Sequence, residues 1–220
     1  MAQHLSAIIL AAGFSSRMGA LKTLLPLGER TMLEHSLALF RDGGIEDLVV
    51  VTGHRAEAIR TIAERAGARI AHNQDFAAGM FSSIQTGVSR ISDQSKGFFL
   101  LPVDIPLVQQ STVRLMARSF AESPVRILYP VFDGRRGHPP LLAADLIPAI
   151  IEQKNPEGGL RSLLARITAD QSDQVREIPV TDPYIHIDID TPEEYLVCCQ
   201  YVHRRNVSTL TESKICLSHL

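Results

Sequence analysis

Short, continuously apolar runs recur along the chain, and longer segments with helical periodicity separate them. The runs occupy residues 7–10, 48–51, 98–101 and 127–128. Runs this short, without polar alternation, are typical of strands that are covered on both faces, as in a parallel sheet between two layers of helices. The hydrophobic pattern therefore predicts buried strands at these four places.

The segments between these runs place apolar side chains on one face of a helix. Leu33, Leu37 and Phe40 share a stripe, which follows the candidate N-cap residue Thr31 and precedes a glycine pair that favours a helix end. The apolar residues between positions 56 and 66 form a second stripe. Alternating strands and helices predict an α/β, doubly wound fold with a mainly parallel sheet and helices on both faces. Such folds bind ligands at the carboxyl ends of the strands.

The composition excludes several classes of function. The 220 residues are 45% hydrophobic and 21% charged with a net charge of −2, which is ordinary for a globular protein. There is no basic excess to neutralise a nucleic-acid backbone. The three cysteines form no CxxC pair, and the longest apolar run, residues 7–12, is far shorter than the roughly 20 residues of a membrane span. We therefore expect a cytoplasmic protein without a signal peptide and with no nucleic-acid or membrane partner.

The last residues differ from the rest of the chain. We expect residues 1–204 to form one domain, because they contain no internal repeat and no low-complexity linker. Residues 204–208 resemble a linker, and Thr209 with Glu212 fits a capping box that begins a new helix. Residues 205–220 are therefore predicted to be a linker and tail. This tail either packs back on the domain or begins a second helical module of a longer natural chain, and we favour the second module.

A loop of small residues with two cations follows the first predicted strand. Residues 10–22 read Leu-Ala-Ala-Gly-Phe-Ser-Ser-Arg-Met-Gly-Ala-Leu-Lys. Glycine and alanine let backbone N–H groups approach phosphate oxygens, and Arg17 and Lys22 supply positive charge. The spacing matches neither the Walker A loop nor the G-x-G-x-x-G motif. The loop therefore predicts a phosphate site of another type at the end of this strand.

Two aspartates each follow a predicted strand. Asp104 follows residues 98–103, and Asp190 follows the alternating residues 185–189, whose period places Asp188 on the same face as a reserve ligand. Each aspartate also fits a turn or cap before the proline that comes two positions later. Mg²⁺ prefers a few carboxylates together with phosphate oxygens and water. We expect Asp104 and Asp190 to hold Mg²⁺ beside the phosphate loop.

These residues belong to motifs that resemble those of the MobA-like nucleotidyltransferases. The first loop matches L-A-A-G-x-S-x-R-M-G-x-x-K, and a stretch rich in leucine and proline follows it. Later motifs agree in order and spacing, at Asn73 with residues 79–84, and at residues 101–106, 134–139 and 188–195. The resemblance covers residues 5–200 and is closest to the molybdenum cofactor cytidylyltransferases, which join CMP from CTP to molybdopterin and release pyrophosphate. It implies a Rossmann-like nucleotidyltransferase fold that uses Mg²⁺.

The resemblance also implies roles for individual side chains. It implies that Arg17, Lys22 and Asp104 are catalytic. The residues implied to bind the nucleotide are Leu10, Ala11, Ala12, Gly13, Ser15, Asn73, Gly79, Ser82 and Ser83. Those implied to bind the acceptor are Arg135, Arg136, His138 and Arg161. Ala12 favours CTP, because the GTP-using members more often carry a second glycine there.

Several alternatives remain open at this point. Ser82 and Ser83 also fit the polar first turn of a helix that runs to Ile91, and His138 also fits a structural role. Pro140 and Gly159 depart from the family pattern and leave the identity of the acceptor open.

We expect a Mg²⁺-dependent cytidylyltransferase whose partners are CTP or another nucleoside triphosphate, molybdopterin cofactor, and a molybdoenzyme or one of its maturation proteins. One alternative is transfer to a sugar phosphate or another small phosphorylated acceptor. An alternative of another class is a regulatory module that binds a nucleotide without turnover, which would not require both carboxylates. A redox dinucleotide-binding domain fits least, because its glycine spacing and its acidic residue about 20 positions later are missing.

Overall fold

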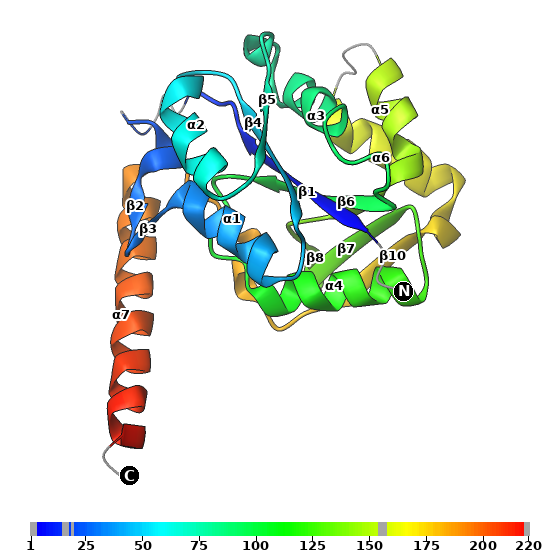
Figure 1. Ribbon diagram of the computed structural model, residues 1–220. Helices are drawn as coiled ribbons and strands as arrows, with labels where there is room; N and C mark the ends of the chain where they lie inside the picture. The colour runs from blue at the N-terminus through cyan, green and yellow to red at the C-terminus, as the bar shows by residue number, and fades with distance from the viewer. Residues whose placement is uncertain (1–3, 15–17, 19, 154–157, 218–220) are drawn as a thin grey trace.

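A twisted, mostly parallel β-sheet forms the centre of the molecule (Figure 1). The computed structural model describes residues 4–14, 18, 20–153 and 158–217, with side chains through residue 204. The strands of this sheet are β1 (Leu5–Ala11), β4 (Asp47–Thr52), β5 (Arg69–His72), β6 (Gly97–Pro102), β7 (Ile127–Phe132), β8 (Arg135–Arg136), β9 (Leu141–Ala143) and β10 (Val175–Pro179). Their spatial order is β10-β7-β9-β6-β1-β4-β5, and β8 pairs with β7. The strands β2 (Pro26–Leu27) and β3 (Arg30–Thr31) form a separate antiparallel pair.

Strand β1 is an interior strand of the sheet and is buried along its whole length. It is parallel to β4 on one side and to β6 on the other, with Ile8 opposite Val49 and Leu100. Strand β9 is antiparallel to both of its neighbours, β6 and β7. All four predicted strands are confirmed, as β1, β4, β6 and β7.

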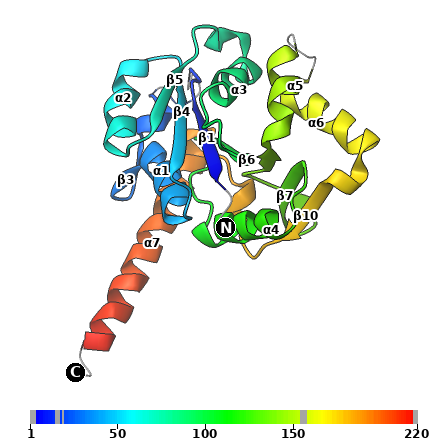
Figure 2. The ribbon, with the colours of Figure 1, turned by 45° about the vertical axis from the view of Figure 1, so that its right-hand side comes forward.

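Helices cover both faces of the sheet (Figure 2). Apolar side chains of α1, α2 and α4 pack on one face, and those of α3, α5 and α6 pack on the other. The helices are α1 (Met32–Asp42), α2 (Ala56–Arg65), α3 (Met80–Val88), α4 (Gln110–Glu122), α5 (Ile147–Glu152), α6 (Gly159–Asp170) and α7 (Pro192–Leu217). Short 3-10 helices are η2 (Lys22–Leu24), η3 (Phe76–Ala78), η4 (Ala144–Leu146), η5 (Ser172–Gln174) and η6 (Pro183–His186). The doubly wound α/β prediction is confirmed.

Helix α1 begins and ends where the sequence predicts. The Thr31 hydroxyl accepts a hydrogen bond from the Glu34 N–H at 3.3 Å, and a Glu34 carboxylate oxygen accepts one from the Thr31 N–H at 2.7 Å. This capping box satisfies two N–H groups that the helix leaves without partners. Gly43 caps the other end, and the predicted apolar stripe is buried against the sheet. Helix α3 ends at Val88, before the predicted Ile91.

The alternating segment of residues 185–189 is not a strand, so that prediction is wrong. Ile185 and Ile189 are fully buried, as alternation requires, but this segment pairs with none of the strands in the described part of the chain. Its polar groups bond to loops instead: the Ile185 carbonyl accepts from the His138 N–H at 2.9 Å, and the Ile189 N–H donates to the Asp104 carbonyl at 2.8 Å. The alternating pattern therefore predicted the buried positions correctly and the strand pairing wrongly, because loop residues satisfy the backbone polar groups of this segment.

Helix α7 is continuous through the residues predicted to be a linker. The capping box that begins it is formed by Thr191 and Glu194. No proline or glycine follows Pro192 in the chain, so no residue interrupts the helical backbone. The helix start predicted at Thr209 is therefore wrong, whereas the division into a domain of residues 1–204 and a tail stays a prediction. Figure 1 shows the C-terminal part of α7 projecting away from the sheet and its covering helices.

Candidate active site

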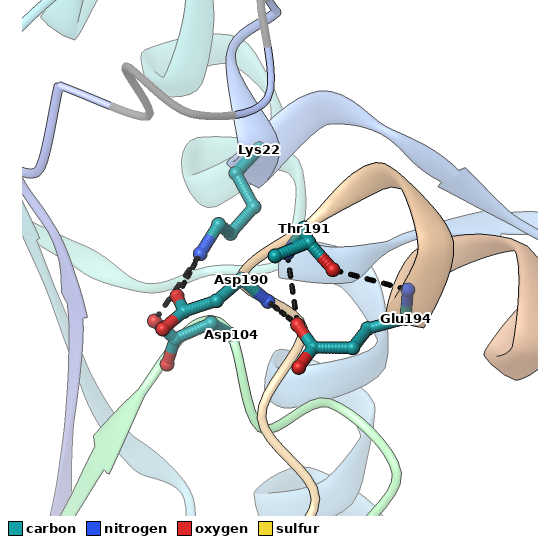
Figure 3. A network of polar contacts seen from close by, with 5 residues as sticks. All are labelled: Lys22, Asp104, Asp190, Thr191 and Glu194. Atoms are coloured by element: carbon teal, nitrogen blue, oxygen red, sulfur yellow. Dashed lines mark hydrogen bonds and ion pairs between the residues drawn. The ribbon is translucent and has the colours of Figure 1, made fainter.

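The Lys22 ammonium reaches two carboxylates at the carboxyl edge of the sheet, those of Asp104 and Asp190 (Figure 3). Its Nζ is 2.7 Å from Asp190 Oδ1 and 3.5 Å from Asp104 Oδ2. The Lys22 side chain is 11% exposed, whereas those of Asp104 and Asp190 are 28% and 39% exposed. The structure thus brings together three of the residues that the sequence singled out, with the ammonium inside and the carboxylates reaching solvent.

The turn that follows β6 positions Asp104. The Val103 N–H donates to the Leu10 carbonyl at 3.1 Å, and the Ile105 N–H donates to the Pro102 carbonyl at 3.2 Å. These bonds hold the turn against the end of β1, where the small-residue loop begins. The carboxylate is therefore placed by the parallel pairing of β1 and β6.

Asp190 is placed by the start of α7. Its backbone N–H and that of Thr191 both donate to one Glu194 carboxylate oxygen, at 2.8 and 2.9 Å (Figure 3). The Thr191 hydroxyl accepts from the Glu194 N–H at 3.2 Å. The cap predicted as one alternative for Asp190 thus falls on its neighbour, Thr191, and the Asp190 carboxylate pairs with Lys22.

Lys22 begins the 3-10 helix η2. The Leu24 N–H donates to the Leu21 carbonyl at 2.9 Å, and the Leu25 N–H donates to the Lys22 carbonyl at 3.0 Å. Leu21 is buried in the same apolar cluster as α1. Packing and the tight turn therefore hold the backbone of Lys22 while its ammonium extends to the carboxylates.

The electrostatics of the cluster favour a cation. Burial raises the pKa of Asp104, the Lys22 ammonium opposes that shift, and the negative charge of Asp190 adds to it. Two carboxylates so close together repel unless a positive charge lies between them. The cluster is therefore arranged to hold positive charge at this edge of the sheet.

A cavity of about 360 Å³ opens beside the cluster. Lys22 and Asp104 line it, together with the buried Thr23 and Ser83. Its apolar lining comes from the first loop, from the segment before α3 and from the end of β6: Leu10, Ala12, Phe14, Phe76, Ala77, Met80, Pro102 and Val103. The cavity combines a charged region with a larger apolar one, as a ligand with both an anionic and a planar apolar part requires.

Some of the predicted nucleotide-binding residues line this cavity and others do not. Leu10, Ala12, Gly13, Gly79 and Ser83 line it. Ala11 packs in the apolar cluster on the opposite face of the sheet, because successive side chains of a strand alternate.

Asn73 and Ser82 have partners within the protein. The buried Asn73 amide donates to the hydroxyls of Ser82 and Ser83 at 2.9 and 3.0 Å, and Ser82 donates to the carbonyls of Gly79 and Asp75. Asn73 therefore holds the first turn of α3 against the end of β5. Gly79 has a φ of 104°, a backbone conformation that favours glycine at this helix start.

The predicted acceptor-binding arginines lie on two elements, Arg135 and Arg136 on β8 and Arg161 on α6. Arg136, on β8, is 2.6 Å from Glu177 and stacks over the Tyr129 ring at 4.6 Å. Arg135 is exposed, and its carbonyl is 3.1 Å from His186 Nε2. Arg161 is exposed on the first turn of α6. Their predicted role stays a prediction.

His138 occupies a half-buried position between β6 and the segment before α7. Burial lowers its pKa, whereas a hydrogen bond to the Leu100 backbone and the charge of Asp188 raise it. Its Nδ1 is buried without a partner among the described residues. Residues 185–189 are not a strand, so strand alternation no longer argues for placing Asp188 beside Asp190, and its role as a reserve ligand stays a prediction.

Two predicted residues, Ser15 and Arg17, lie outside the described residues. Sequence reasoning also missed two features of the site. The spacing of Thr191 and Glu194 is a capping-box signal that identifies the start of α7. Phe14 lies within the loop motif at a position that the family pattern leaves open, and it lines the cavity.

Two carboxylates and a lysine fit a divalent cation that is shared with a phosphorylated substrate. Among the described residues, no group of three or more His, Cys, Asp or Glu side chains converges as a complete metal cage. Mg²⁺ does not need one, because it takes one or two carboxylates and completes its coordination with phosphate oxygens and water. The oxygens of Asp104 and Asp190 already converge on a cation, the Lys22 ammonium.

Comparison with known proteins gives the family. The model of the MobA-like NTP transferase domain matches residues 7–175. The chain is 27% identical over 190 residues to the molybdenum cofactor cytidylyltransferase of Escherichia coli K12, covering 86% of this chain and 92% of that protein. It is 32% identical over 196 residues to the nicotine blue oxidoreductase of Paenarthrobacter nicotinovorans, covering 85% and 92%.

A solved structure shows the same fold. Rv0371c of Mycobacterium tuberculosis H37Rv superposes with a TM-score of 0.76 at 24% identity, covering 91% of this chain and 99% of that one. That protein has also been solved in complex with manganese. In the described part of this chain, no helix is long and apolar enough to cross a membrane. The family model spans most of the sheet, the first loop and the carboxylate that follows β6, and the chain accordingly belongs to the family of the MobA-like NTP transferase domain.

Proposed function

We propose that this protein transfers CMP from CTP to molybdopterin cofactor, with Mg²⁺ as the divalent cation. The observation that carries the proposal is the placement of Lys22 between Asp104 and Asp190, beside a cavity lined by the small-residue loop. Membership in the MobA-like family supports nucleotidyl transfer, and the Escherichia coli relative supports cytidylyl transfer to this acceptor.

The reaction needs charge neutralisation more than a covalent nucleophile. An oxygen of the acceptor phosphate forms a bond to the α-phosphorus of CTP, and the bond from that phosphorus to the pyrophosphate oxygen breaks. Pyrophosphate leaves with the electron pair of the broken bond. Catalysis of this step rests on positioning and on cations that stabilise charge on the phosphoryl oxygens.

The residues of the site can supply these functions. A divalent cation held by Asp104 and Asp190 would neutralise triphosphate oxygens. The Lys22 ammonium, which contacts both carboxylates, would provide a second positive charge for the triphosphate. The cavity beside β1, which residues of the first loop line, would hold the base and ribose. Arg17 is proposed to contact the triphosphate as a bidentate donor.

The test is pyrophosphate release with separate nucleotides and acceptors. We would incubate the protein with CTP, GTP, ATP or UTP, Mg²⁺, and either molybdopterin or a sugar 1-phosphate. Asp104→Asn should slow release by about 10²-fold, whereas Asp93→Asn, which removes an exposed carboxylate, should leave it unchanged. Release with GTP and not with CTP would overturn the base assignment, and release with the sugar phosphate alone would overturn the acceptor.

A redox activity is the second candidate, because one relative is named an oxidoreductase. It is tested by following the oxidation of NADH and NADPH with an electron-accepting dye. Nicotinamide oxidation without pyrophosphate release would replace the proposal. Nucleotide binding with neither activity would indicate the regulatory module.

A further inference from the structure

Two helices of this chain begin with the same capping box, and one of them adjoins the candidate active site. In α1, a Glu34 oxygen accepts from the Thr31 N–H at 2.7 Å, and the Thr31 hydroxyl accepts from the Glu34 N–H at 3.3 Å. In α7, the equivalent distances for Glu194 and Thr191 are 2.9 and 3.2 Å. The two boxes therefore match in these backbone hydrogen bonds, whereas in α1 the Thr31 hydroxyl also donates to the same Glu34 oxygen at 2.8 Å.

The box of α7 makes one additional hydrogen bond. The Asp190 N–H donates to the same Glu194 oxygen at 2.8 Å (Figure 3). On its other side, the Ile189 N–H donates to the Asp104 carbonyl at 2.8 Å. The backbone of Asp190 is thus held from both directions, and its carboxylate is 2.7 Å from Lys22.

The acceptor in this box is charged at neutral pH. Hydrogen bonds from the N–H groups of Asp190 and Thr191 lower the pKa of Glu194. Hydrogen bonds to an ionised acceptor are shorter and stronger than those between neutral groups. The start of a helix also favours a negative charge.

We propose that Glu194 is a positioning residue of the site: by holding the Asp190 backbone, it fixes the contact between the Asp190 carboxylate and Lys22. The effect of Glu194 on the contact between Asp190 and Lys22 is inferred from the geometry alone. Its effect on turnover rests also on the proposed function. Glu194 contacts neither Lys22 nor the cavity lining among the described contacts, so it acts through Asp190.

The experiment compares three variants. Glu194→Ala removes the acceptor, Glu194→Gln keeps an acceptor oxygen, and Glu34→Ala removes the matching box from α1 as a control for lost helix capping. Exchange of the Lys22 ammonium protons with water, followed by heteronuclear NMR, reports the contact without nucleotide or metal. The kcat/KM of pyrophosphate release is measured in parallel.

We expect Glu194→Ala to speed ammonium exchange about tenfold and to lower kcat/KM by a similar factor, with Glu194→Gln restoring most of both. Glu34→Ala should lower the melting temperature about as much as Glu194→Ala does, because each removes one capping box. It should leave ammonium exchange and kcat/KM at the wild-type level. Unchanged ammonium exchange in Glu194→Ala, or an equal change in Glu34→Ala, would overturn the proposal, as would a wild-type ammonium that exchanges freely. If no nucleotide is turned over, the proposed function fails while ammonium exchange still decides the positioning role.

A different observation concerns the apolar side of the cavity. Phe14 lines it and is 53% exposed, although it is a large apolar side chain. Its ring centroid is 5.1 Å from that of Phe76 and 5.5 Å from that of His54. Phe76 itself packs closely against the backbone of Gly53, because a Cβ added at Gly53 would lie 2.6 Å from Phe76 Cβ. The neighbouring rings therefore support Phe14 from one side and leave the rest of its surface open.

We infer that Phe14 is the residue on which the nucleobase stacks. Exposed aromatic faces beside a cationic site bind planar bases with little sequence preference. The inference rests on the proposed function, because it requires a nucleoside triphosphate in this cavity, with its phosphates toward Lys22.

The chain contains no tryptophan, so Phe14→Trp creates a single fluorescent probe. We expect saturable quenching by CTP and none by inorganic tripolyphosphate, and Phe14→Ala should weaken CTP binding about tenfold. Leu115→Trp, an exposed position on α4, serves as the control and should not respond. Equal quenching by tripolyphosphate, or no quenching while equilibrium dialysis shows bound CTP, would overturn the stacking role alone. If dialysis shows that no nucleotide binds, the proposed function and this role fall together.

Discussion

Lys22→Met removes the positive charge between Asp104 and Asp190 and retains a long apolar side chain. At neutral pH it leaves two carboxylates facing each other. Coulomb's law gives about 4 kcal/mol for unit charges about 4 Å apart at an effective dielectric constant of about 20. The Asp190 side chain is 39% exposed, so solvent screens much of this energy. We expect the free energy of unfolding to fall by about 1–3 kcal/mol at neutral pH.

The loss should depend on pH in a defined direction. Burial already raises the pKa of Asp104, and Lys22 opposes that shift, so the variant raises it further. A carboxyl whose pKa is higher in the folded state than in the unfolded state binds its proton more tightly when folded. Lowering the pH therefore stabilises the folded variant. The deficit should be largest above the raised pKa of Asp104 and should shrink as the pH falls toward about 4, the ordinary value for aspartate.

The assay is urea unfolding of the wild type, Lys22→Met, Asp190→Asn and the double variant, at about pH 7.5 and about pH 5. The double-mutant cycle isolates the coupling between the Lys22 and Asp190 side chains. An equal loss at both pH values would show that lost packing, not charge, destabilises the variant. Zero coupling would show that Lys22 and Asp190 do not pair in solution.

Three further predictions follow from the same structure. Asp104→Asn should keep the fold, as circular dichroism would show, and lower kcat by about 10²-fold, because one carboxylate no longer contributes to charge neutralisation; full activity would remove Asp104 from the site. Gly53→Ala should lower the free energy of unfolding by about 1–3 kcal/mol in urea, because the new Cβ meets Phe76 at 2.6 Å, whereas Gly13→Ala has no neighbour within 4 Å and should cost less than about 1 kcal/mol. Deleting residues 206–220 should leave the melting temperature and turnover unchanged, and a drop of several degrees would place these residues in the core of the domain.

The local sequence determined much of the fold. Each short apolar run became a buried strand, because a strand covered on both faces needs apolar side chains at every position. Thr31 and the apolar stripe after it determined the start and the buried face of α1, since capping and amphipathicity act within a few residues. The small-residue loop after β1 indicated where a cavity would open. These features depend on neighbours in the chain, so the chain reveals them.

Other parts of the structure depended on distant segments. The order of the sheet and the antiparallel β9 follow from which strands find partners, which no local pattern encodes. Residues 185–189 have the alternation of a strand, yet their backbone bonds to the loops after β6 and β8. A local signal also failed in α7, which begins at Pro192 and continues through the predicted linker. The capping signal at Thr209 does not start a helix there, because that residue lies inside a helix already begun.

The candidate site shows most clearly which features the local sequence determines and which depend on the tertiary structure. The residue types and their positions after strands pointed to Lys22, Asp104 and Asp190 one at a time. Their contact joins side chains as far as 168 residues apart, and only the parallel pairing of β1 with β6 and the capping of α7 bring them within 3.5 Å. Charge interactions at this range depend on distance and burial, and both are properties of the folded chain.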